Sequence, residues 1–172
     1  MTALPDQERF LALLEEHRKI LYKVANSYCR DPEDRRDLVQ EIVVQLWRSF
    51  GRFDERAGFS AWMYRIAMNV AISFYRSESR RERRTELVEE SVLEILAVDR
   101  ASSDDAPDEI RQLHRFIGQL DELNRALVIL YLDGNSHETI GEILGISTTN
   151  VGTRIGRIKE RLRKDFDRTA NG

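Results

Sequence analysis

The sequence predicts an all-α protein made of two small helical domains joined by a linker. Only 9 glycines and 3 prolines occur among 172 residues, and runs of β-branched residues are rare. Apolar residues recur instead at spacings of three and four, which is typical of amphipathic helices. Hydrophobic residues make up 41% of the chain, enough for a packed core. The domains are expected at residues 1–77 and 109–172, with residues 78–108 as the linker.

Three helices are expected in the first domain. Apolar and ring side chains recur on one stripe from Gln7 to Cys29, which predicts a single first helix over that range. Asp31 and Pro32 mark the start of the second helix, because Asp is a favoured N-cap and Pro fits the first helical position. A polar loop, residues 51–58, separates the second helix from a third, which spans about Ser60 to Arg76.

The third helix has two chemically different faces. Its inner stripe is expected to be Trp62, Ile66, Val70 and Phe74, with Met63, Ala67 and Ala71 alongside. The opposite face presents polar side chains about four residues apart, namely Arg65, Asn69, Ser73 and Arg76. Nearby aromatic rings can stack on exposed bases while arginines hold the backbone. These rings belong to Phe59, Trp62, Tyr64 and Tyr75, although Trp62 taken alone fits a core position better.

Charge is unevenly distributed along a chain whose net charge is only −3. Residues 76–84 carry +3, residues 85–109 carry −8 and residues 151–168 carry +4. The acidic stretch lies in the predicted linker, where residues 87–98 have the pattern of a short amphipathic helix. Two basic segments flanking an acidic one suit a nucleic-acid binder, but charge runs are also common on solvated faces.

Four helical segments are expected in the second domain. Pro107 opens the first, Ser136 caps the third, and the last runs from Thr148 to about Phe166. Gly145 tolerates the positive φ of a tight turn, so residues 136–164 predict a helix-turn-helix. The apolar residues expected to lock its helices together are Ile140, Ile143, Ile146, Val151 and Ile155.

Small polar and basic side chains occupy the outer start of the last helix, where a recognition helix meets the major groove. Asn can pair with adenine and Arg with guanine, while Thr can contact a thymine methyl or a phosphate. The candidate DNA-binding residues are Thr148, Thr149, Asn150, Thr153, Arg154, Arg157 and Arg161, the last expected at a phosphate. An ordinary helical hairpin with a basic surface is the structural alternative.

Two stretches resemble conserved regions of a known family. Residues 10–77, with Asp37-Leu-Val-Gln-Glu41 and Ala61-Trp-Met-Tyr-Arg-Ile-Ala-Met-Asn-Val-Ala-Ile72, resemble region 2 of bacterial sigma-70-type RNA polymerase sigma factors. Residues 109–168, with Ser136-His-Glu-Thr-Ile-Gly-Glu-Ile-Leu-Gly-Ile-Ser147, resemble region 4. The two motifs in this order, separated by a linker, resemble the compact extracytoplasmic-function (ECF, group IV) subfamily.

The resemblance implies an alternative sigma factor that binds core RNA polymerase, directs it to specific promoters and promotes DNA opening. Docking on the clamp of the β′ subunit would involve Asp37, Leu38, Gln40 and Glu41, and the β flap is a second implied contact. The third helix would contact the −10 element, the 51–58 loop would receive a flipped base, and the last helix would contact the −35 element. Promoter DNA and, in many members of the family, an anti-sigma protein are further implied partners.

Two features depart from the family pattern. Arg35 and Arg36 stand where a more acidic run is usual, so they are expected to weaken clamp binding or to require an activating step. Gly152 and Gly156 lie inside the predicted recognition helix, where each costs about 1 kcal/mol relative to alanine. Close backbone approach is one explanation for these glycines, and lowered stability is the other.

Other functional classes fit the sequence less well. His17, His114 and His137 are scattered, Cys29 has no second cysteine to pair with, and no catalytic residue, metal site or cofactor is expected. The longest apolar run, Ala126 to Leu132, is too short to cross a bilayer, so a cytoplasmic protein without membrane insertion is expected. A conventional repressor or activator would leave the first domain's pattern unexplained. Besides an enzyme and a conventional regulator, a purely protein-binding helical module is the third alternative class.

Overall fold

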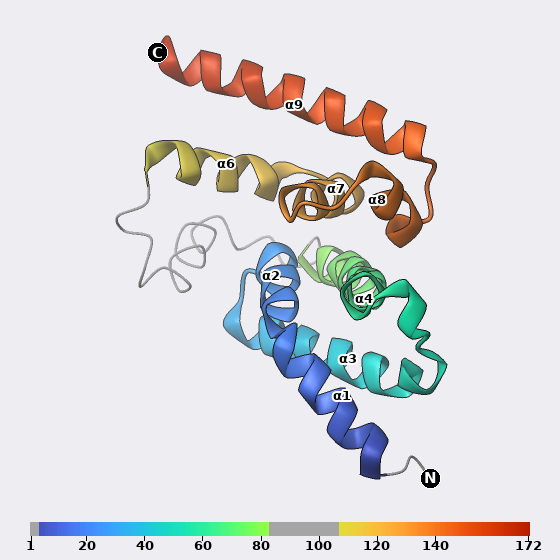
Figure 1. Ribbon diagram of the computed structural model, residues 1–172. Helices are drawn as coiled ribbons and strands as arrows, with labels where there is room; N and C mark the ends of the chain where they lie inside the picture. Colours follow the sequence, from blue (N-terminus) through green and yellow to red (C-terminus); the bar gives the residue numbers. More distant parts are fainter. Residues whose placement is uncertain (1–3, 83–106) are drawn as a thin grey trace. The chain divides into compact units, whose positions relative to one another are not determined.

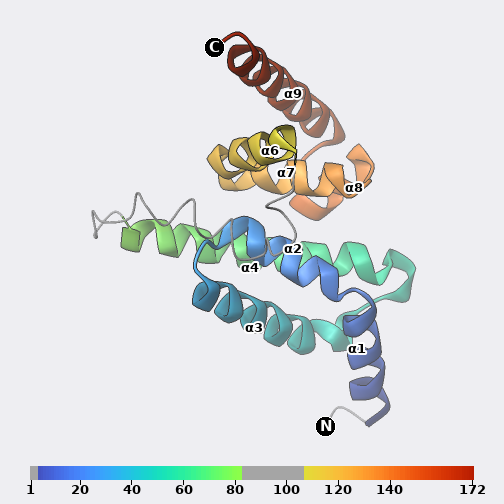
Figure 2. The same ribbon diagram turned by 90° about the vertical axis from the view of Figure 1, so that its left-hand side faces the viewer.

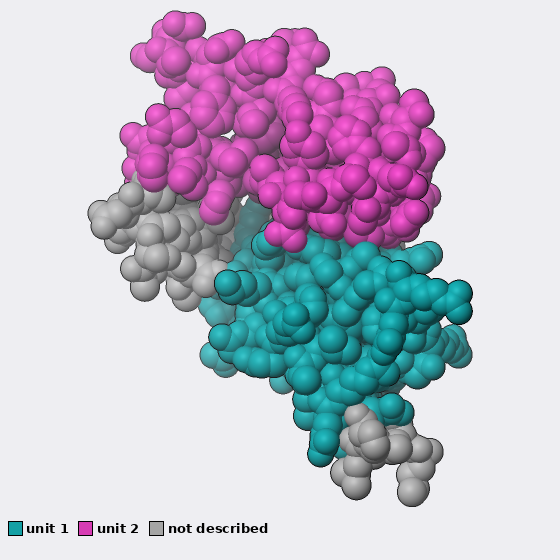
Figure 3. Space-filling view, viewed as in Figure 1, with its two compact units in different colours: residues 1–92 teal, residues 93–172 magenta. Residues whose placement is uncertain are grey.

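The computed structural model describes residues 4–82 and 107–172, and all regular elements within these ranges are helical. This confirms the predicted all-α class. The chain divides into two compact units, residues 1–92 and 93–172, which are coloured separately in Figure 3. The division falls within the predicted linker. The possible helix at residues 87–98 lies outside the described residues.

Three helices build the core of the first unit. They are α2 (Arg18–Tyr28), α3 (Pro32–Ser49) and α4 (Phe59–Glu82), and each packs against the other two (Figure 1). The N-cap of α3 is as predicted, because the Asp31 carboxylate accepts a hydrogen bond from the Glu33 backbone N–H at 2.8 Å. Fully buried side chains come from all three helices, among them Val24, Leu38, Ile42, Leu46, Met63 and Ala67.

The prediction of a single first helix is wrong, because α1 (Leu4–Glu16) ends before His17 and α2 begins after it. His17 has φ −107° and ψ 12°, and its ring packs on that of Phe59 at a centroid distance of 5.1 Å. The break lets α1 point away from α2 (Figure 2), so that Phe10 reaches Trp47 with ring centroids 5.1 Å apart. Neither glycine nor proline marks this position, and the apolar stripe continues through it.

Two short 3-10 turns, η1 (Phe50–Arg52) and η2 (Glu55–Ala57), connect α3 to α4. The loop is less polar in structure than its sequence suggests, because Phe53 packs on Trp62 at a centroid distance of 5.0 Å. Helix α4 continues to Glu82 rather than ending near Arg76. The added turns contain arginine and glutamate, which favour helix, and neither glycine nor proline interrupts them.

The second unit contains α6 (Asp108–Gln119), α7 (Glu122–Leu132), α8 (His137–Leu144) and α9 (Thr148–Ala170). Helix α9 packs against the other three, and Figure 1 shows it lying lengthwise over α6 and across α7. Phe116, Leu120 and Ile158 form a core cluster there. The buried Arg125 closes the end of α6, since its Nη2 donates hydrogen bonds to the backbone oxygens of Gly118 and Leu120 at 2.9 and 3.0 Å.

Candidate nucleic-acid interface

The predicted helix-turn-helix is present in the second unit, where α8, a tight turn and α9 follow one another. Ser136 caps α8, because its Oγ accepts a hydrogen bond from the Thr139 backbone N–H at 3.1 Å. Gly145 ends α8 in the left-handed region at φ +71°, as predicted. Ser147 then caps α9 by accepting from the Asn150 backbone N–H at 3.1 Å. Both helix starts are therefore fixed by serine caps.

Close backbone contact locks the turn against α8 at Gly141, a position that the sequence patterns did not single out. A Cβ placed on Gly141 would lie 2.7 Å from the backbone oxygen of Ile146, well inside contact distance. The predicted apolar lock forms around this contact. Ile140, Ile143, Val151 and Ile155 are buried, and Ile146 is half-buried.

The predicted DNA-binding residues of α9 fall into two groups. Thr148, Thr149, Thr153, Arg157 and Arg161 are exposed. Asn150 and Arg154 are half-buried and hydrogen-bonded to each other, with Arg154 Nε donating to Asn150 Oδ1 at 3.0 Å. The Arg161 guanidinium lies 5.9 Å from the ring centroid of Phe116 on α6, so it stands apart from the start of the helix. The exposed group and the bonded pair together form the α9 surface.

Packing within the second unit does not require the two glycines inside α9. A Cβ on Gly152 would make an ordinary contact of 3.5 Å with the His137 ring, and a Cβ on Gly156 would meet nothing within 4 Å. Close backbone approach among the described residues therefore does not explain either glycine.

The buried face of α4 is shifted from the predicted stripe toward the residues expected alongside it. Trp62, Ile66, Val70 and Phe74, the expected inner stripe, are only half-buried. Full burial falls on Met63, Ala67 and Ala71, which are expected alongside that stripe, and on Tyr64 and Met68, which are not. The reason is that α4 packs against both α2 and α3, so its buried arc is wider than a single stripe and is centred between these two helices.

The polar face of α4 is exposed as predicted, with Arg65, Asn69, Ser73 and Arg76 all accessible. We call these four residues the α4 surface. Two aromatic candidates do not belong to it, and their prediction as accessible DNA-binding residues is wrong for this structure: Tyr64 is 0% exposed and Phe59 is 6% exposed. Trp62 is half-buried between Phe53 and Phe59, so it is mainly a packing residue here.

Three of the four predicted polymerase-binding residues are exposed on α3, namely Asp37, Gln40 and Glu41. Leu38 is 0% exposed and packs in the core, so the structure contradicts its prediction as an accessible contact. Of the two unusual arginines, Arg36 is exposed, whereas Arg35 is half-buried and donates from Nη1 to Asn26 Oδ1 at 3.3 Å. Arg36 is thus the one placed to affect a docking partner directly.

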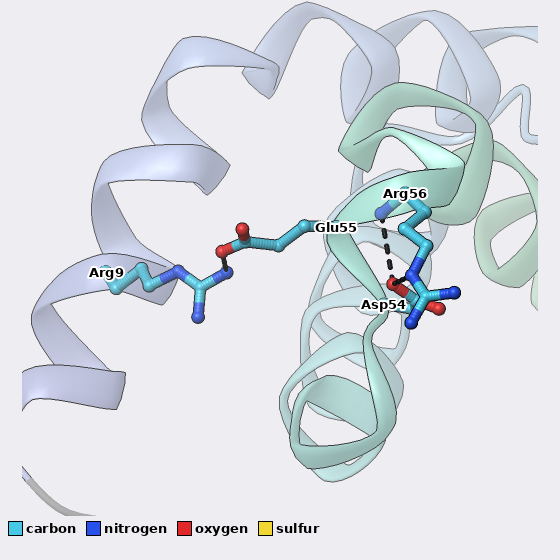
Figure 4. A network of polar contacts seen from close by, with 4 residues as sticks. All are labelled: Arg9, Asp54, Glu55 and Arg56. Atoms are coloured by element: carbon cyan, nitrogen blue, oxygen red, sulfur yellow. Dashed lines mark hydrogen bonds and ion pairs between the residues drawn. The ribbon is translucent and has the colours of Figure 1, made fainter.

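Polar contacts hold the loop between α3 and α4 to α1 (Figure 4). Arg9 on α1 forms an ion pair with Glu55, and Asp54 accepts from the Arg56 backbone N–H at 3.1 Å. The Arg9 guanidinium also lies 5.6 Å from the ring centroid of Phe50. Sequence patterns gave no sign of this anchor, because it joins residues 46 positions apart. It joins the loop that precedes α4 to α1.

Within residues 4–82 and 107–172, no helix has the length and apolarity needed to cross a bilayer. The same residues contain no group of three or more His, Cys, Asp or Glu side chains arranged to hold a metal ion.

Both units are similar to known protein families. The chain matches the family models for sigma-70 region 2 at residues 13–81 and sigma-70 region 4 at residues 110–162. It is 30% identical over 163 residues to the RNA polymerase sigma-H factor of Pseudomonas aeruginosa, covering 90% of this chain and 83% of that protein. It is 27% identical over 171 residues to the ECF RNA polymerase sigma factor SigW of Bacillus subtilis, covering 94% and 90%.

Solved structures show the same likeness. The structure of CnrH in complex with the cytosolic domain of CnrY is 25% identical, with a TM-score of 0.67 and coverage of 94% of this chain and 89% of that chain. CnrH is a sigma factor of Cupriavidus metallidurans. The sigma factor RpoE of Bartonella quintana, solved with the anti-sigma factor NepR, shares the fold at 22% identity, with a TM-score of 0.70 and coverage of 94% and 96%.

Proposed function

The chain belongs to the sigma-70 family of RNA polymerase sigma factors, in its ECF group, and we propose that it binds core RNA polymerase, directs it to specific promoters and promotes DNA opening. The observation that carries this proposal is the presence of both conserved regions, in the family's order, in one chain. A conventional regulator with one helix-turn-helix needs only the second of them.

The first unit docks on the polymerase and engages the −10 element. Asp37, Gln40 and Glu41 are exposed on α3 and supply polar groups for the clamp of the β′ subunit. The α4 surface faces away from the core and offers two arginines and an amide to a separated strand. DNA opening requires a site that binds unstacked bases. The loop at residues 51–58, which precedes α4 and is held by Arg9 and by Phe53, is the candidate for this site.

The second unit engages the −35 element as duplex DNA. The start of α9 enters the major groove, as the second helix of a helix-turn-helix does. Arg154, Arg157 and Asn150 contact base edges, while Thr148, Thr149, Thr153 and Arg161 contact methyl groups or phosphates. The unit also contacts the β flap of the polymerase.

The chain makes and breaks no covalent bond and acts in the cytoplasm, where the polymerase is. We assign an anti-sigma protein as its regulator by analogy, since RpoE of Bartonella quintana was solved with the anti-sigma factor NepR. The exposed faces that engage DNA and polymerase are the surfaces that such a protein would have to cover.

Transcription in vitro with core polymerase and a promoter library tests the proposal. Addition of the chain is expected to produce initiation at a defined subset of promoters that share two spaced elements. If core polymerase neither binds the chain nor gains selectivity from it, the proposal is wrong.

Binding to DNA without polymerase separates this function from that of a conventional regulator. The chain alone is expected to bind promoter duplex weakly and the complex with polymerase to bind it tightly. Tight, sequence-specific binding by the chain alone, unchanged by polymerase, would identify a conventional repressor or activator.

A further inference from the structure

A line of side-chain hydrogen bonds connects the start of α9 to the start of α7. Arg154 donates from Nε to Asn150 Oδ1 at 3.0 Å and from Nη1 to Asn124 Oδ1 at 3.3 Å. Asn124 lies 30 residues earlier in the chain, in the first turn of α7. The guanidinium of Arg154 is therefore held from two sides, one of them on another helix.

Asp121, the N-cap of α7, determines how Asn124 is oriented. Its Oδ1 accepts from the Asn124 backbone N–H at 2.8 Å, and its Oδ2 accepts from Asn124 Nδ2 at 3.0 Å. A carboxylate only accepts hydrogen bonds, so it selects the nitrogen end of the Asn124 amide. The oxygen end is then left for Arg154, whose guanidinium only donates.

The same reasoning orients Asn150. Arg154 holds its amide oxygen, and the Asn150 amide nitrogen has no partner among the described residues. Pairing with adenine uses both ends of an Asn amide, with the oxygen accepting and the nitrogen donating. In this arrangement Asn150 presents donors, as does Arg154, which keeps three of its five N–H groups.

We propose that Asn124 is a positioning residue for −35 recognition: oriented by Asp121, it holds Arg154 so that Arg154 and Asn150 present donors to one acceptor-rich feature of duplex DNA. The inference rests on the proposed function, because it assigns a role within the promoter-contacting helix. The acceptors are those of a base edge, such as guanine O6 and N7, or those of a phosphate. Asn124 itself touches no DNA in this scheme.

A double-mutant cycle tests the proposal with the full chain and core RNA polymerase. Transcription from a library randomised in the −35 element is measured for the wild type, Asn124→Ala, Arg154→Ala and the double variant. Asn124→Ala is expected to lower the preference for the best −35 sequences by about three- to tenfold, and to have no further effect once Arg154 is alanine. Equal effects of Asn124→Ala in both backgrounds would overturn the proposal.

The pattern of lost −35 preference shows whether the contacted acceptor is a base edge or a phosphate. A change confined to one −35 position indicates a base edge, whereas a uniform loss over all sequences, still dependent on Arg154, indicates a phosphate. The position affected by Asn150→Ala is expected to prefer a base whose major-groove edge presents acceptors and no donor, such as guanine. A preference for adenine there, lost in Asn150→Ala, would overturn the donor assignment of Asn150.

Two variants control for a merely structural effect. Asp121→Ser keeps an N-cap on α7 but has one side-chain oxygen, so it should loosen Asn124 and shift −35 preference in the same direction with the helix intact. Gln112→Ala removes a different amide, which donates from α6 to Thr169 Oγ1 at the far end of α9 at 2.9 Å. It is expected to leave −35 preference unchanged, and a shift equal to that of Asn124→Ala would contradict the proposal.

Failure of the inference is distinguishable from failure of the proposed function. If the wild-type chain supports selective initiation but Asn124→Ala behaves as wild type, only the inference fails. If the wild-type chain gives no selectivity to core polymerase, the proposed function fails and the inference fails with it.

Discussion

The two candidate DNA surfaces are built in opposite ways. The α4 surface is one face of a single helix, and Arg65, Asn69 and Ser73 have no side-chain hydrogen bond within the described residues. The α9 surface includes a bonded pair, Asn150 and Arg154, tied to α7 and adjacent to a serine cap. These three side chains of the α4 surface can adjust their positions, whereas the bonded pair on α9 is pre-organised.

This difference suits the two forms of DNA that we assign to them. Duplex DNA presents base edges at fixed positions, so donors held in place lose little entropy on binding. A separated strand has no fixed geometry, and side chains that can adjust are better suited to it. Substitutions are therefore expected to act singly in the α4 surface and to be coupled at the start of α9.

The largest expected effect is the loss of stability when a core residue of the first unit is truncated. Leu38→Ala should lower the free energy of unfolding by about 2–5 kcal/mol, because it leaves a cavity among α2, α3 and α4. Denaturant unfolding measures this. Gln40→Ala, an exposed neighbour, should leave stability within about 0.5 kcal/mol and weaken polymerase binding instead. Unchanged stability in Leu38→Ala, with lost polymerase binding, would restore Leu38 as a contact.

Substitution of a residue packed against the turn between α8 and α9 should lower stability by nearly as much. Gly141→Ala places a Cβ 2.7 Å from the Ile146 backbone oxygen, which should destabilise the unit by about 1–3 kcal/mol and disturb the start of α9. Gly156→Ala is the matched control, because its Cβ meets open space and should stabilise α9 by about 1 kcal/mol. Thermal unfolding of both variants checks this, and equal shifts would show that the turn is not tightly packed.

Substitution of a residue that contacts duplex DNA is expected to have the next largest effect. Arg157→Ala should weaken −35-dependent initiation by about 1–3 kcal/mol if the arginine contacts a base. Arg168→Ala removes the same charge near the other end of α9 and controls for general attraction to DNA. Quantitative transcription from promoters with intact and altered −35 elements separates the two, and an unchanged promoter preference in Arg157→Ala would count against its role.

The α4 surface should show a smaller effect at a different step. Asn69→Ala removes one exposed amide and should impair promoter opening by about 1 kcal/mol while leaving polymerase binding intact. Permanganate footprinting of opened DNA and a polymerase-binding assay report these steps separately. Equal losses in both assays would mean that Asn69 contacts the polymerase instead.

The smallest expected effect concerns the unusual arginines of α3. Arg36 is exposed and adds positive charge beside Asp37, so Arg36→Glu should strengthen clamp binding by less than about 1 kcal/mol. A titration of core polymerase at low salt, where surface charges are least screened, measures this change. An unchanged affinity would remove Arg36 as a cause of weak docking.

Local patterns predicted the elements whose signals lie within a few residues. Asp31, Ser136 and Gly145 have the roles expected of them, because capping and positive φ depend on neighbouring backbone groups. The polar face of α4 was predictable for the same reason, since helical spacing alone groups its residues. The break at His17 was not, because it accompanies the packing of Phe10 on Trp47 and of His17 on Phe59, and both partner rings come from distant segments.

Amino-acid sequence alone determined the helical class, the two-block organisation and the family, since periodicity, caps and motifs are properties of the chain itself. Tertiary structure decided how far the buried arc of α4 extends, that Tyr64 and Leu38 lie in the core, and that Arg154 is held by Asn124. These features depend on where a second or third helix packs, and residues far apart in sequence meet only when the chain has folded.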